Sequence, residues 1–484
     1  MAYRIEHLEL FVRETPPNRM SFALGKQGRK AAVQATTNPL VHVRMVVNDG
    51  NRQTTFGTAA DRLSVRWLDK RPGRSKPLKL RELVGLIGFA RDLYLQSPEF
   101  VSPFDYWRKQ HVQIMREGDR RGQEKLTSSF ASALFERAVL DAVSRLAGKS
   151  IHEMVVGERL GFQPDRVFPE LRGLNFKATL PARPRTRFFI RHTVGASDPL
   201  TAADLPDEQR VNDGLPETLE EYIRVDGVRY FKVKITGDVD RDFERLSRVW
   251  DVVSRAEEPA ITLDANESYG NLQDLQQIID RCERDLTGFF QHVMYIEQPL
   301  PRALTLDPAT RKGIRALAEK KLLIIDEADD ALDSFHRARA IGYQGTSHKN
   351  CKGFFKSLIN HGLVVQAALQ GREEVLSGED LQNLPVVPLH QDFATLGILG
   401  LEHCERNGHH YNFGLSFLSK RDKANVVKSH PDLYHQRGDE WFMRVHRGQV
   451  DCASLQCPGF GVSAEPDWAS MLPMDQWIRQ RYPA

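Results

Sequence analysis

The feature that most constrains the fold is an alternation of short β-rich runs with helical patterns after about residue 187. The β-rich runs lie at residues 188–193, 230–235, 261–266, 293–298, 322–327, 345–350 and 374–378. Between them, apolar residues recur at helical spacing, as in residues 240–256. Strands that alternate with helices in this way predict a parallel sheet. Seven alternations over about 220 residues suit an α/β fold, a (β/α) TIM-like barrel of eight units or slightly fewer.

A doubly wound open sheet is the alternative, but no glycine-rich phosphate loop follows any of these runs, which argues against its nucleotide-binding form. Hydrophobic residues make up 41% of the chain, charged residues 27%, and the net charge is +3. This balance predicts a soluble globular protein with no nucleic-acid or membrane partner. The five cysteines form no CxxC pair, and the start of the chain lacks the pattern of a signal peptide, so we expect a cytoplasmic protein.

Three units are expected along the chain. Residues 1–185 read as an α+β domain, with strands at 4–13 and 41–48 and helices at 78–96 and 127–146. Residues 186–415 form the barrel. Residues 416–484 are irregular, rich in Pro, Trp and His, and are expected to pack back on the first domain.

Three consecutive runs each end in a carboxylate: Asp264, Glu297 and Asp326. The active site of such a barrel lies at the C-terminal ends of its strands. One acid there more often pairs with Lys or Arg, but three on successive strands favour a metal, because unpaired buried carboxylates are costly. Mg²⁺ prefers such oxygen ligands.

Lysines lie on both sides of these acids. Lys232 and Lys234 share one face of their strand, because side chains alternate along it. Lys349 ends a later strand across the barrel. Lysine is rarely buried unless it is paired or functional. We expect desolvation and a nearby metal to lower the lysine pKa values and so provide general bases.

These motifs resemble, in order, those of the enolase superfamily in its mandelate racemase and muconate lactonizing branch. Lys232-Val233-Lys234 resembles the second-strand Lys-x-Lys of that family, and Lys349 resembles the sixth-strand lysine. Asp264, Glu297 and Asp326 resemble the three metal ligands. From Lys234 to Lys349 the motifs are separated by 30, 33, 29 and 23 residues, each close to one strand–helix unit. The resemblance implies a capping domain, built from the N-terminal part and the C-terminal tail, over the barrel mouth.

The resemblance also implies a chemistry. One Mg²⁺ per barrel, held by the three acids, binds the substrate carboxylate, and Lys234 or Lys349 removes the α-proton to give an enediolate. Lys232 assists them, while Asn266 and Glu327 orient the ligands. The enzyme would be an isomerase or lyase that racemises, epimerises, dehydrates or cycloisomerises a small carboxylic acid, and a homo-oligomer is expected.

The sequence departs from the family pattern in three places. Gly353-Phe354 stands where the family has Gly-Gly, and His348 where an apolar residue is common. The seventh strand, which ends Ser377-Gly378-Glu379-Asp380, carries no histidine, so a His–Asp dyad is not expected, and His390 reads as a helix-start or loop residue.

Two other functions stay open, namely a Schiff-base lysine barrel enzyme and a non-catalytic ligand-binding barrel. Substrate specificity is expected from residues 14–40, whose basic side chains hint at an acidic ligand: Arg19, Lys26, Arg29 and Lys30.

Overall fold

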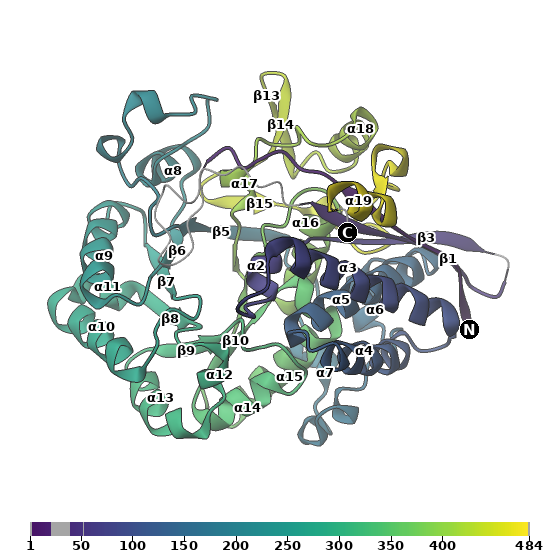
Figure 1. Ribbon diagram of the computed structural model, residues 1–484, viewed down its shortest axis with the longest axis horizontal. Helices are drawn as coiled ribbons and strands as arrows, with labels where there is room; N and C mark the ends of the chain where they lie inside the picture. Colours follow the sequence, from purple (N-terminus) through teal and green to yellow (C-terminus); the bar gives the residue numbers. More distant parts are fainter. Residues whose placement is uncertain (1, 21–38, 52, 483–484) are drawn as a thin grey trace.

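A computed structural model of the chain describes residues 2–20, 39–51 and 53–482. Eight parallel strands form a closed barrel (Figure 1). In order they are β5 (Arg187–Val194), β6 (Tyr230–Lys234), β7 (Ala260–Asp264), β8 (Val293–Glu297), β9 (Leu322–Ile325), β10 (Gly345–His348), β11 (Val375–Gly378) and β12 (His403–Glu405). The ring closes where β12 pairs with β5, at Cys404 opposite Ile190. The predicted barrel is thereby confirmed, with an eighth strand that the sequence did not reveal.

Helices connect the strands and surround the barrel. They are α8 (Leu219–Asp226), α9 (Val239–Val253), α10 (Leu272–Asp285), α11 (Thr287–His292), α12 (Arg302–Thr305), α13 (Arg311–Ala318), α14 (Ser334–Ile341), α15 (Phe354–Leu369), α16 (Val387–Leu399) and α17 (Gly408–Tyr411). Their amphipathic pattern explains this position. On α9, for example, Leu246, Val249 and Val253 are buried, whereas polar residues cover the opposite face.

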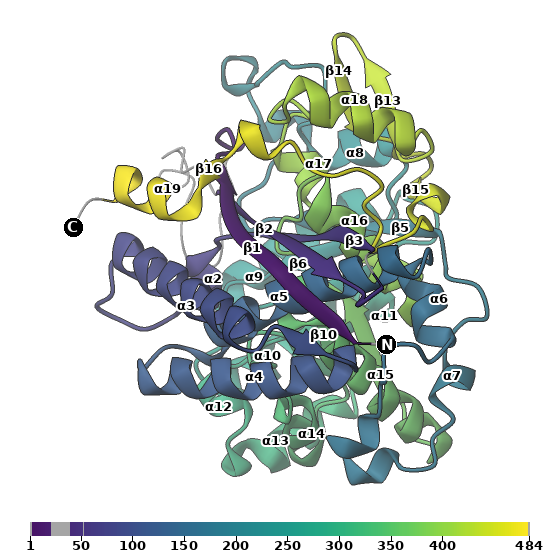
Figure 2. The same ribbon diagram turned by 90° about the vertical axis from the view of Figure 1, so that its right-hand side faces the viewer.

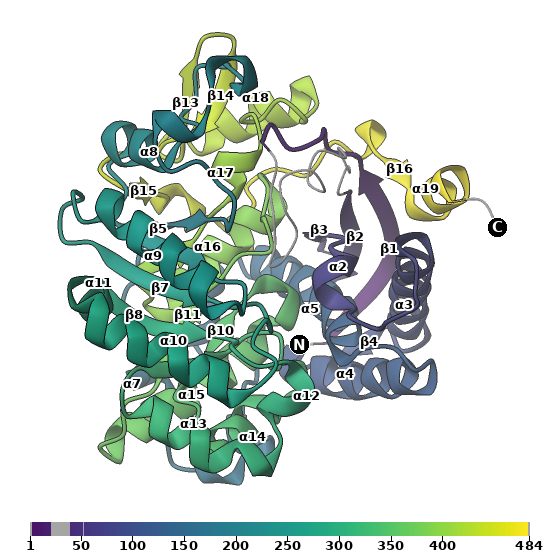
Figure 3. The ribbon, with the colours of Figure 1, turned by 60° about the vertical axis from the view of Figure 1, so that its left-hand side comes forward.

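An antiparallel sheet and a group of helices lie to one side of the barrel (Figure 3). The sheet has the order β16-β1-β2-β3, with β4 also paired to β1. Its strands are β1 (Tyr3–Arg13), β2 (Leu40–Asn48), β3 (Thr54–Arg62), β4 (Glu99–Phe100) and β16 (Leu472–Pro473). The helices are α2 (Val65–Leu68), α3 (Lys76–Gln96), α4 (Pro103–Arg120), α5 (Lys125–Leu146), α6 (Ile151–Val156) and α7 (Phe176–Thr179).

Helix α5 joins this sheet to the barrel. All of its residues from Leu126 to Ser144 are buried. Glu136 on α5 accepts hydrogen bonds from the backbone N–H groups of Phe354 (3.1 Å) and Phe355 (2.7 Å), which open α15. A carboxylate is favourable at a helix N-terminus, because the first N–H groups of a helix lack internal partners. The loop after β10, which carries Lys349, is therefore anchored on α5.

The C-terminal part of the chain contacts both halves. Its elements are α18 (Lys420–Ser429), β13 (Tyr434–Arg437), β14 (Glu440–Met443), β15 (Gln449–Asp451) and α19 (Met474–Arg481). Strand β15 pairs antiparallel with β5 of the barrel, and β16 pairs with β1 of the N-terminal sheet (Figure 2). The unit boundaries at residues 185 and 415 stay predictions.

No helix among the described residues is long and apolar enough to cross a membrane. All five cysteines are free thiols.

Candidate active site

The strand register places the predicted residues in one row at the C-terminal end of the barrel. Lys234 on β6 is opposite Asp264 on β7, and Asp264 is opposite Glu297 on β8. Asp326 directly follows β9, and Lys349 directly follows β10. All five side chains are at least 95% buried. The structure thus brings together the residues that the sequence selected.

Lys232 lies at the centre of a ring of carboxylates. Its Nζ is 2.7 Å from Glu297 Oε2, 3.0 Å from Asp264 Oδ2 and 3.0 Å from Glu405 Oε2, and it also donates to Glu379. Glu379 and Glu405 come from the ends of the seventh and eighth strands, and sequence reasoning assigned neither a role. Glu379 was visible as the end of a predicted strand, but β12, which carries Glu405, has only three residues and left no recognisable pattern.

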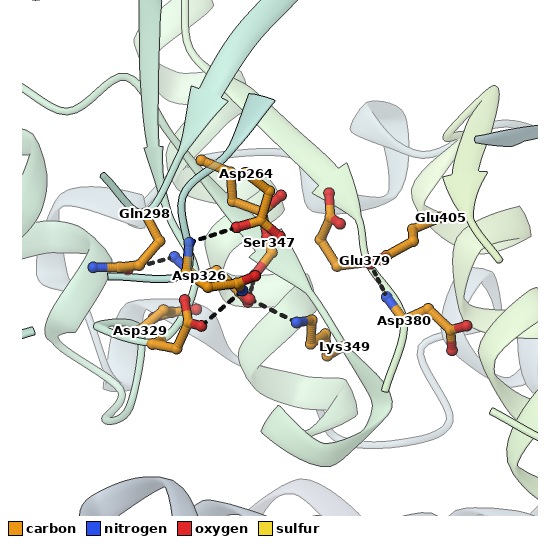
Figure 4. A network of polar contacts seen from close by, with 12 residues as sticks. Asp264, Gln298, Asp326, Asp329, Ser347, Lys349, Glu379, Asp380 and Glu405 are labelled. Atoms are coloured by element: carbon orange, nitrogen blue, oxygen red, sulfur yellow. Dashed lines mark hydrogen bonds and ion pairs between the residues drawn. The ribbon is translucent and has the colours of Figure 1, made fainter. Parts of the chain in front are cut away.

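Asp326 is held by three donors (Figure 4). Lys349 Nζ lies 2.6 Å from Asp326 Oδ2, while Lys352 Nζ (2.9 Å) and Ser347 Oγ (2.5 Å) both donate to Oδ1. Gln298 fixes the backbone of Asp326, because its Oε1 accepts a hydrogen bond from the Asp326 N–H at 2.9 Å. Lys352 was missed by the sequence reasoning, although it lies three residues after Lys349 in the same turn.

Lys234 and Lys349 have different surroundings. Lys234 donates to Asp264 Oδ2 at 2.5 Å. Lys349, besides its bond to Asp326, lies with its Nζ 4.2 Å from the ring centroid of Trp67 on α2. A cation over an indole face is stabilised by the ring electrons. The N-terminal part of the chain therefore contributes a wall to this end of the barrel.

The pKa values of two site lysines are raised in this structure. Burial lowers the pKa of Lys232, but four carboxylates outweigh it and hold the pKa well above its ordinary value. For Lys349, burial is likewise outweighed, chiefly by Asp326, and the pKa is raised. Without a metal, each ammonium faces carboxylates more closely than it faces other cations, and the expected lowering by a bound metal stays a prediction.

The carboxylates divide into two kinds. At Asp326, burial alone would raise the pKa, but the charges of Lys349 and Lys352 outweigh it and hold the pKa well below its ordinary value. Glu297 has the opposite balance, since burial, Asp264 and Glu379 together raise its pKa well above the ordinary value despite Lys232. Among these acids, Glu297 is therefore the one whose negative charge its surroundings stabilise least.

Glu327 and Asn266 form a pair beside this group. Asn266 Nδ2 donates to Glu327 Oε1 at 3.1 Å, while Glu327 Oε2 has no hydrogen-bond partner. Burial and the charge of Asp326 raise the pKa of Glu327 to about 7. Asn266 has a φ of +44°, a left-handed conformation that Asn tolerates better than most residues. The backbone turn after β7 thus aims this amide at Glu327.

Asp264, Glu297 and Asp326 are the candidate metal ligands. Within residues 2–20, 39–51 and 53–482, no three His, Cys, Asp or Glu side chains are arranged to hold a metal ion, and lysine ammonium groups lie on the acids instead. The donor set nevertheless fits Mg²⁺ in its chemistry, because these are three buried carboxylates on neighbouring strands.

Two buried histidines lie near this end of the barrel. His348 Nδ1 lies 2.7 Å from Ser357 Oγ and its Nε2 3.2 Å from Asp392 Oδ1, so the sixth strand carries a His–Asp pair. His390 lies in the first turn of α16, as expected for a helix-start residue, and its Nε2 lies 2.8 Å from Tyr434 Oη.

Of the basic residues expected to bind an acidic ligand, Lys26, Arg29 and Lys30 lie outside the described residues. Arg19 is described, and it is bound to Asp213 at 2.6 Å and to two backbone carbonyls. The Arg19 guanidinium therefore makes structural contacts within the protein.

No family model and no curated protein matches this sequence. Solved structures do match the fold. A mandelate racemase/muconate lactonizing protein from Herpetosiphon aurantiacus matches with a TM-score of 0.61 at 16% identity, over 96% of this chain and 99% of that one. An enolase from Bradyrhizobium, solved with magnesium and mandelic acid, matches with a TM-score of 0.58 at 17% identity, over 97% and 98%.

A third match is a dipeptide epimerase from Methylococcus capsulatus, solved with Mg and the dipeptide L-Arg-D-Lys. Its TM-score is 0.56 at 15% identity, over 95% of this chain and 100% of that one. Each of these matches covers at least 95% of this chain. The chain therefore shares its fold with these proteins, among them a mandelate racemase/muconate lactonizing protein, an enolase and a dipeptide epimerase.

Proposed function

We propose that this protein is an enzyme that removes the proton α to the carboxylate of a small organic acid. One observation supports this above all: Lys234 and Lys349 come from the second and sixth of eight barrel strands, which lie opposite each other. Each lysine is bonded to one acid of the same group, Asp264 or Asp326. Two lysines placed in this way can face the two sides of one carbon atom.

The proposal includes one Mg²⁺ per barrel, held by Asp264, Glu297 and Asp326. When bound, Mg²⁺ supplies a positive charge that takes the substrate carboxylate and stabilises the charge developing on it. Asn266 and Glu327 lie beside these acids and would orient them. The solved enolase and epimerase described above contain magnesium, which supports the same ion here.

The chain's own residues divide the proton transfers. One of Lys234 and Lys349 would take the proton, since each is bonded to one acid of the group. Lys232, fully buried among carboxylates, would stabilise negative charge. The other of Lys234 and Lys349 would return a proton to the opposite face, which gives racemisation or epimerisation. Where the intermediate instead expels a β-substituent, dehydration results, and ring closure and opening correspond to cycloisomerisation.

A second candidate function is a non-catalytic ligand-binding barrel. It is favoured by the way lysines already neutralise the acids, with Lys232, Lys349 and Lys352 all bonded to carboxylates. In the Schiff-base alternative, Lys234 or Lys349 would attack a substrate carbonyl, and borohydride trapping with a carbonyl substrate would distinguish it.

Solvent exchange at the α-carbon tests the proposal. The protein, with Mg²⁺ in heavy water, is incubated with α-hydroxy acids, sugar acids, N-acyl amino acids and dipeptides, and mass spectrometry detects deuterium gain or loss of water. On a substrate that reacts, Lys234→Met and Lys349→Met should each cut exchange by roughly a hundredfold to ten-thousandfold, with opposite preferences for the two enantiomers.

Lys356→Met is the matched control, since Lys356 is also a buried lysine but bonds Asp329 rather than the three acids. It should keep exchange near the parental rate. If the parent binds Mg²⁺ yet exchanges no acid of the library, the non-catalytic barrel is the better description. Equal exchange in all three variants would also refute the assignment of the lysines.

A further inference from the structure

A cavity of about 330 Å³ lies between α8, the segment around α17 and the hairpin β13–β14, which Figure 1 shows at one end of the molecule. This volume is at the lower end of the range for small-molecule pockets, roughly 300–1,000 Å³. Its lining residues include neither the site lysines nor the candidate metal ligands. The cavity is therefore separate from the candidate active site.

Apolar side chains form much of the wall. Leu215 precedes α8 and Val225 lies on it, while Met443 and Val445 come from the end of β14 and the segment after it. All four keep part of their surface accessible, and Val225 is 54% exposed, so these surfaces are available to a ligand. Such a wall suits the hydrocarbon part of a ligand, because contact with it removes apolar surface from water.

A carboxylate without a partner lies in this wall. Asp226 ends α8 and is half-buried, and neither of its side-chain oxygens is bonded to a donor in the described part of the chain. Neither oxygen is among the polar atoms that the fold covers completely, so both remain accessible. Burial raises the pKa of Asp226 to about 6, and a carboxylate at the C-terminal end of a helix faces the negative end of the helix dipole. A cation from a ligand would stabilise this carboxylate.

A guanidinium lies on the other side of the same cavity. Arg437 ends β13, its side chain is exposed, and its Nη2 lies 3.8 Å from the point that a Cβ atom on Gly214 would occupy. Glu440, its partner across the hairpin, bonds Lys423 at 2.7 Å, and no acid among the described residues forms an ion pair with Arg437. The charge of Arg437 nevertheless acts to lower the pKa of Asp226, so the two groups lie close enough for one small ligand to contact both.

A ligand that contacts both groups must carry a cation and an anion a short distance apart. An α-amino acid bears its ammonium and carboxylate groups on one carbon atom, and a guanidinium matches a carboxylate in charge and geometry. We propose that this cavity binds an apolar α-amino acid, with its ammonium group on Asp226, its carboxylate on Arg437 and its side chain against the apolar wall. The site is separate from the proposed catalytic chemistry and does not depend on it.

L-Phenylalanine is the probe, titrated calorimetrically into the full-length protein. Phenethylamine lacks its carboxylate and hydrocinnamate lacks its ammonium group, so the two analogues test each charge separately. We expect one L-phenylalanine per chain, with each analogue bound roughly tenfold or more weakly, because each leaves one charged group of the cavity without a partner. No binding of L-phenylalanine, or binding of either analogue as tight as that of L-phenylalanine, would overturn the proposal.

Variants at the two charged groups locate the probe. Asp226→Asn and Arg437→Gln should each weaken L-phenylalanine binding roughly tenfold or more. Asp439→Asn is the control, since Asp439 is exposed on the same hairpin and does not line the cavity, and it should bind like the parent. Val225→Trp should also block binding, because a larger side chain at this exposed position occupies the cavity without disturbing the core.

The fold of each variant is checked by circular dichroism. Val225 and Arg437 are exposed, so their variants test the site even if Asp226→Asn folds poorly. Binding as tight as in the parent by any folded variant of these three residues would refute the site.

Discussion

Lys352 donates to Asp326 twice, to Oδ1 at 2.9 Å and to the backbone oxygen at 2.6 Å, so one lysine fixes both the side chain and the backbone of that acid. Asp326 therefore carries two ammonium partners, Lys352 and Lys349, before any metal is considered. A metal at this acid would have to share it with them.

Lys352→Met should make the protein more dependent on Mg²⁺ for stability. Lys349 stays bonded to Asp326, so removing Lys352 should cost less than the about 3–5 kcal/mol of leaving a buried charge with no partner. A bound divalent ion would restore that charge balance, so the gain in Tm on adding Mg²⁺ should exceed that of the parent. Lys356→Met removes an equally buried lysine that contacts Asp329, and its Mg²⁺-dependent gain should match the parent. Equal gains in both variants would contradict the prediction.

Glu297→Gln and Asp326→Asn should separate metal binding from stability. Glu297 has a raised pKa, so at the acid end of the pH range, where its carboxyl is protonated, the neutral amide should change metal-free stability by less than about 1 kcal/mol. Asp326→Asn leaves Lys349 and Lys352 without their carboxylate and should cost several kcal/mol. Both variants should lose Mg²⁺ binding in calorimetric titrations, and parental binding in either would remove that residue from the ligand set.

The stability of the metal-free protein should fall with rising pH because of Glu297. Its folded pKa lies above the unfolded value of about 4.3, so above that pH the unfolded state releases the proton first and is favoured. The loss continues until pH passes the folded pKa, at up to about 1.4 kcal/mol per pH unit. Asp326 acts oppositely, since its lowered pKa stabilises the fold above pH 4 and that contribution disappears only in acid.

Urea unfolding from pH 5 to 8 measures this effect. The difference in unfolding free energy between Glu297→Gln and the parent should grow with pH, in favour of the variant. A difference that stays constant over that range would show that Glu297 is ionised throughout.

Asn266→Ala should destabilise the protein by about 1–3 kcal/mol, because it removes the amide that bonds Glu327 and places Ala at a φ of +44°. Asn266→Gly also removes the amide but adopts this φ without strain, so it should cost less. Denaturant unfolding of the two variants distinguishes the contributions. Were the Gly variant as unstable as the Ala variant, backbone strain would play no part.

Trp67→Leu should slow turnover on any confirmed substrate while leaving Mg²⁺ binding intact. Trp67 lies over the Lys349 ammonium, a contact worth about 0.5–2 kcal/mol, and is not itself a proposed metal ligand. Trp67→Phe retains an aromatic face and should be closer to the parent. Steady-state kinetics should show turnover falling from the parent to Trp67→Phe and then to Trp67→Leu. A Trp67→Leu variant as active as the parent would exclude a role for this contact.

The sequence predicted the barrel strands well where they are apolar and regularly spaced. Strands β5 to β11 lie within a few residues of the predicted runs, because each consists of a short β-rich run followed by a helix with one apolar face. Strand β12 was missed because its three residues, His403-Cys404-Glu405, show no periodicity. Strand β3 was missed because Gly57, Ala59 and Ala60 are poor strand formers. Its pairing with β2 stabilises the extended conformation that these residues do not favour by themselves.

The site was predictable only as far as strand ends were visible. Lys234, Asp264 and Glu297 end strands that the sequence reveals, so their meeting followed from topology alone. The closeness of Glu405 and Glu379 to Lys232 depends on how the ring closes, and no local pattern encodes that closure. The raised pKa values of Lys232 and Lys349 in the metal-free site depend on these carboxylates and on Asp326, which the ring closure brings together.

The pairing of β16 with β1 has a consequence for biosynthesis. Phe11 pairs with Pro473, and Val12 with Leu472, so strand partners are about 460 residues apart in the chain. At roughly 5–20 residues per second, a ribosome needs about half a minute to a minute and a half to produce the second partner after the first. During that time one edge of β1 is without its strand, and open strand edges favour association between chains. We therefore expect nascent chains to need chaperones most after the barrel has been synthesised and before the C-terminal residues that form β16 have been added.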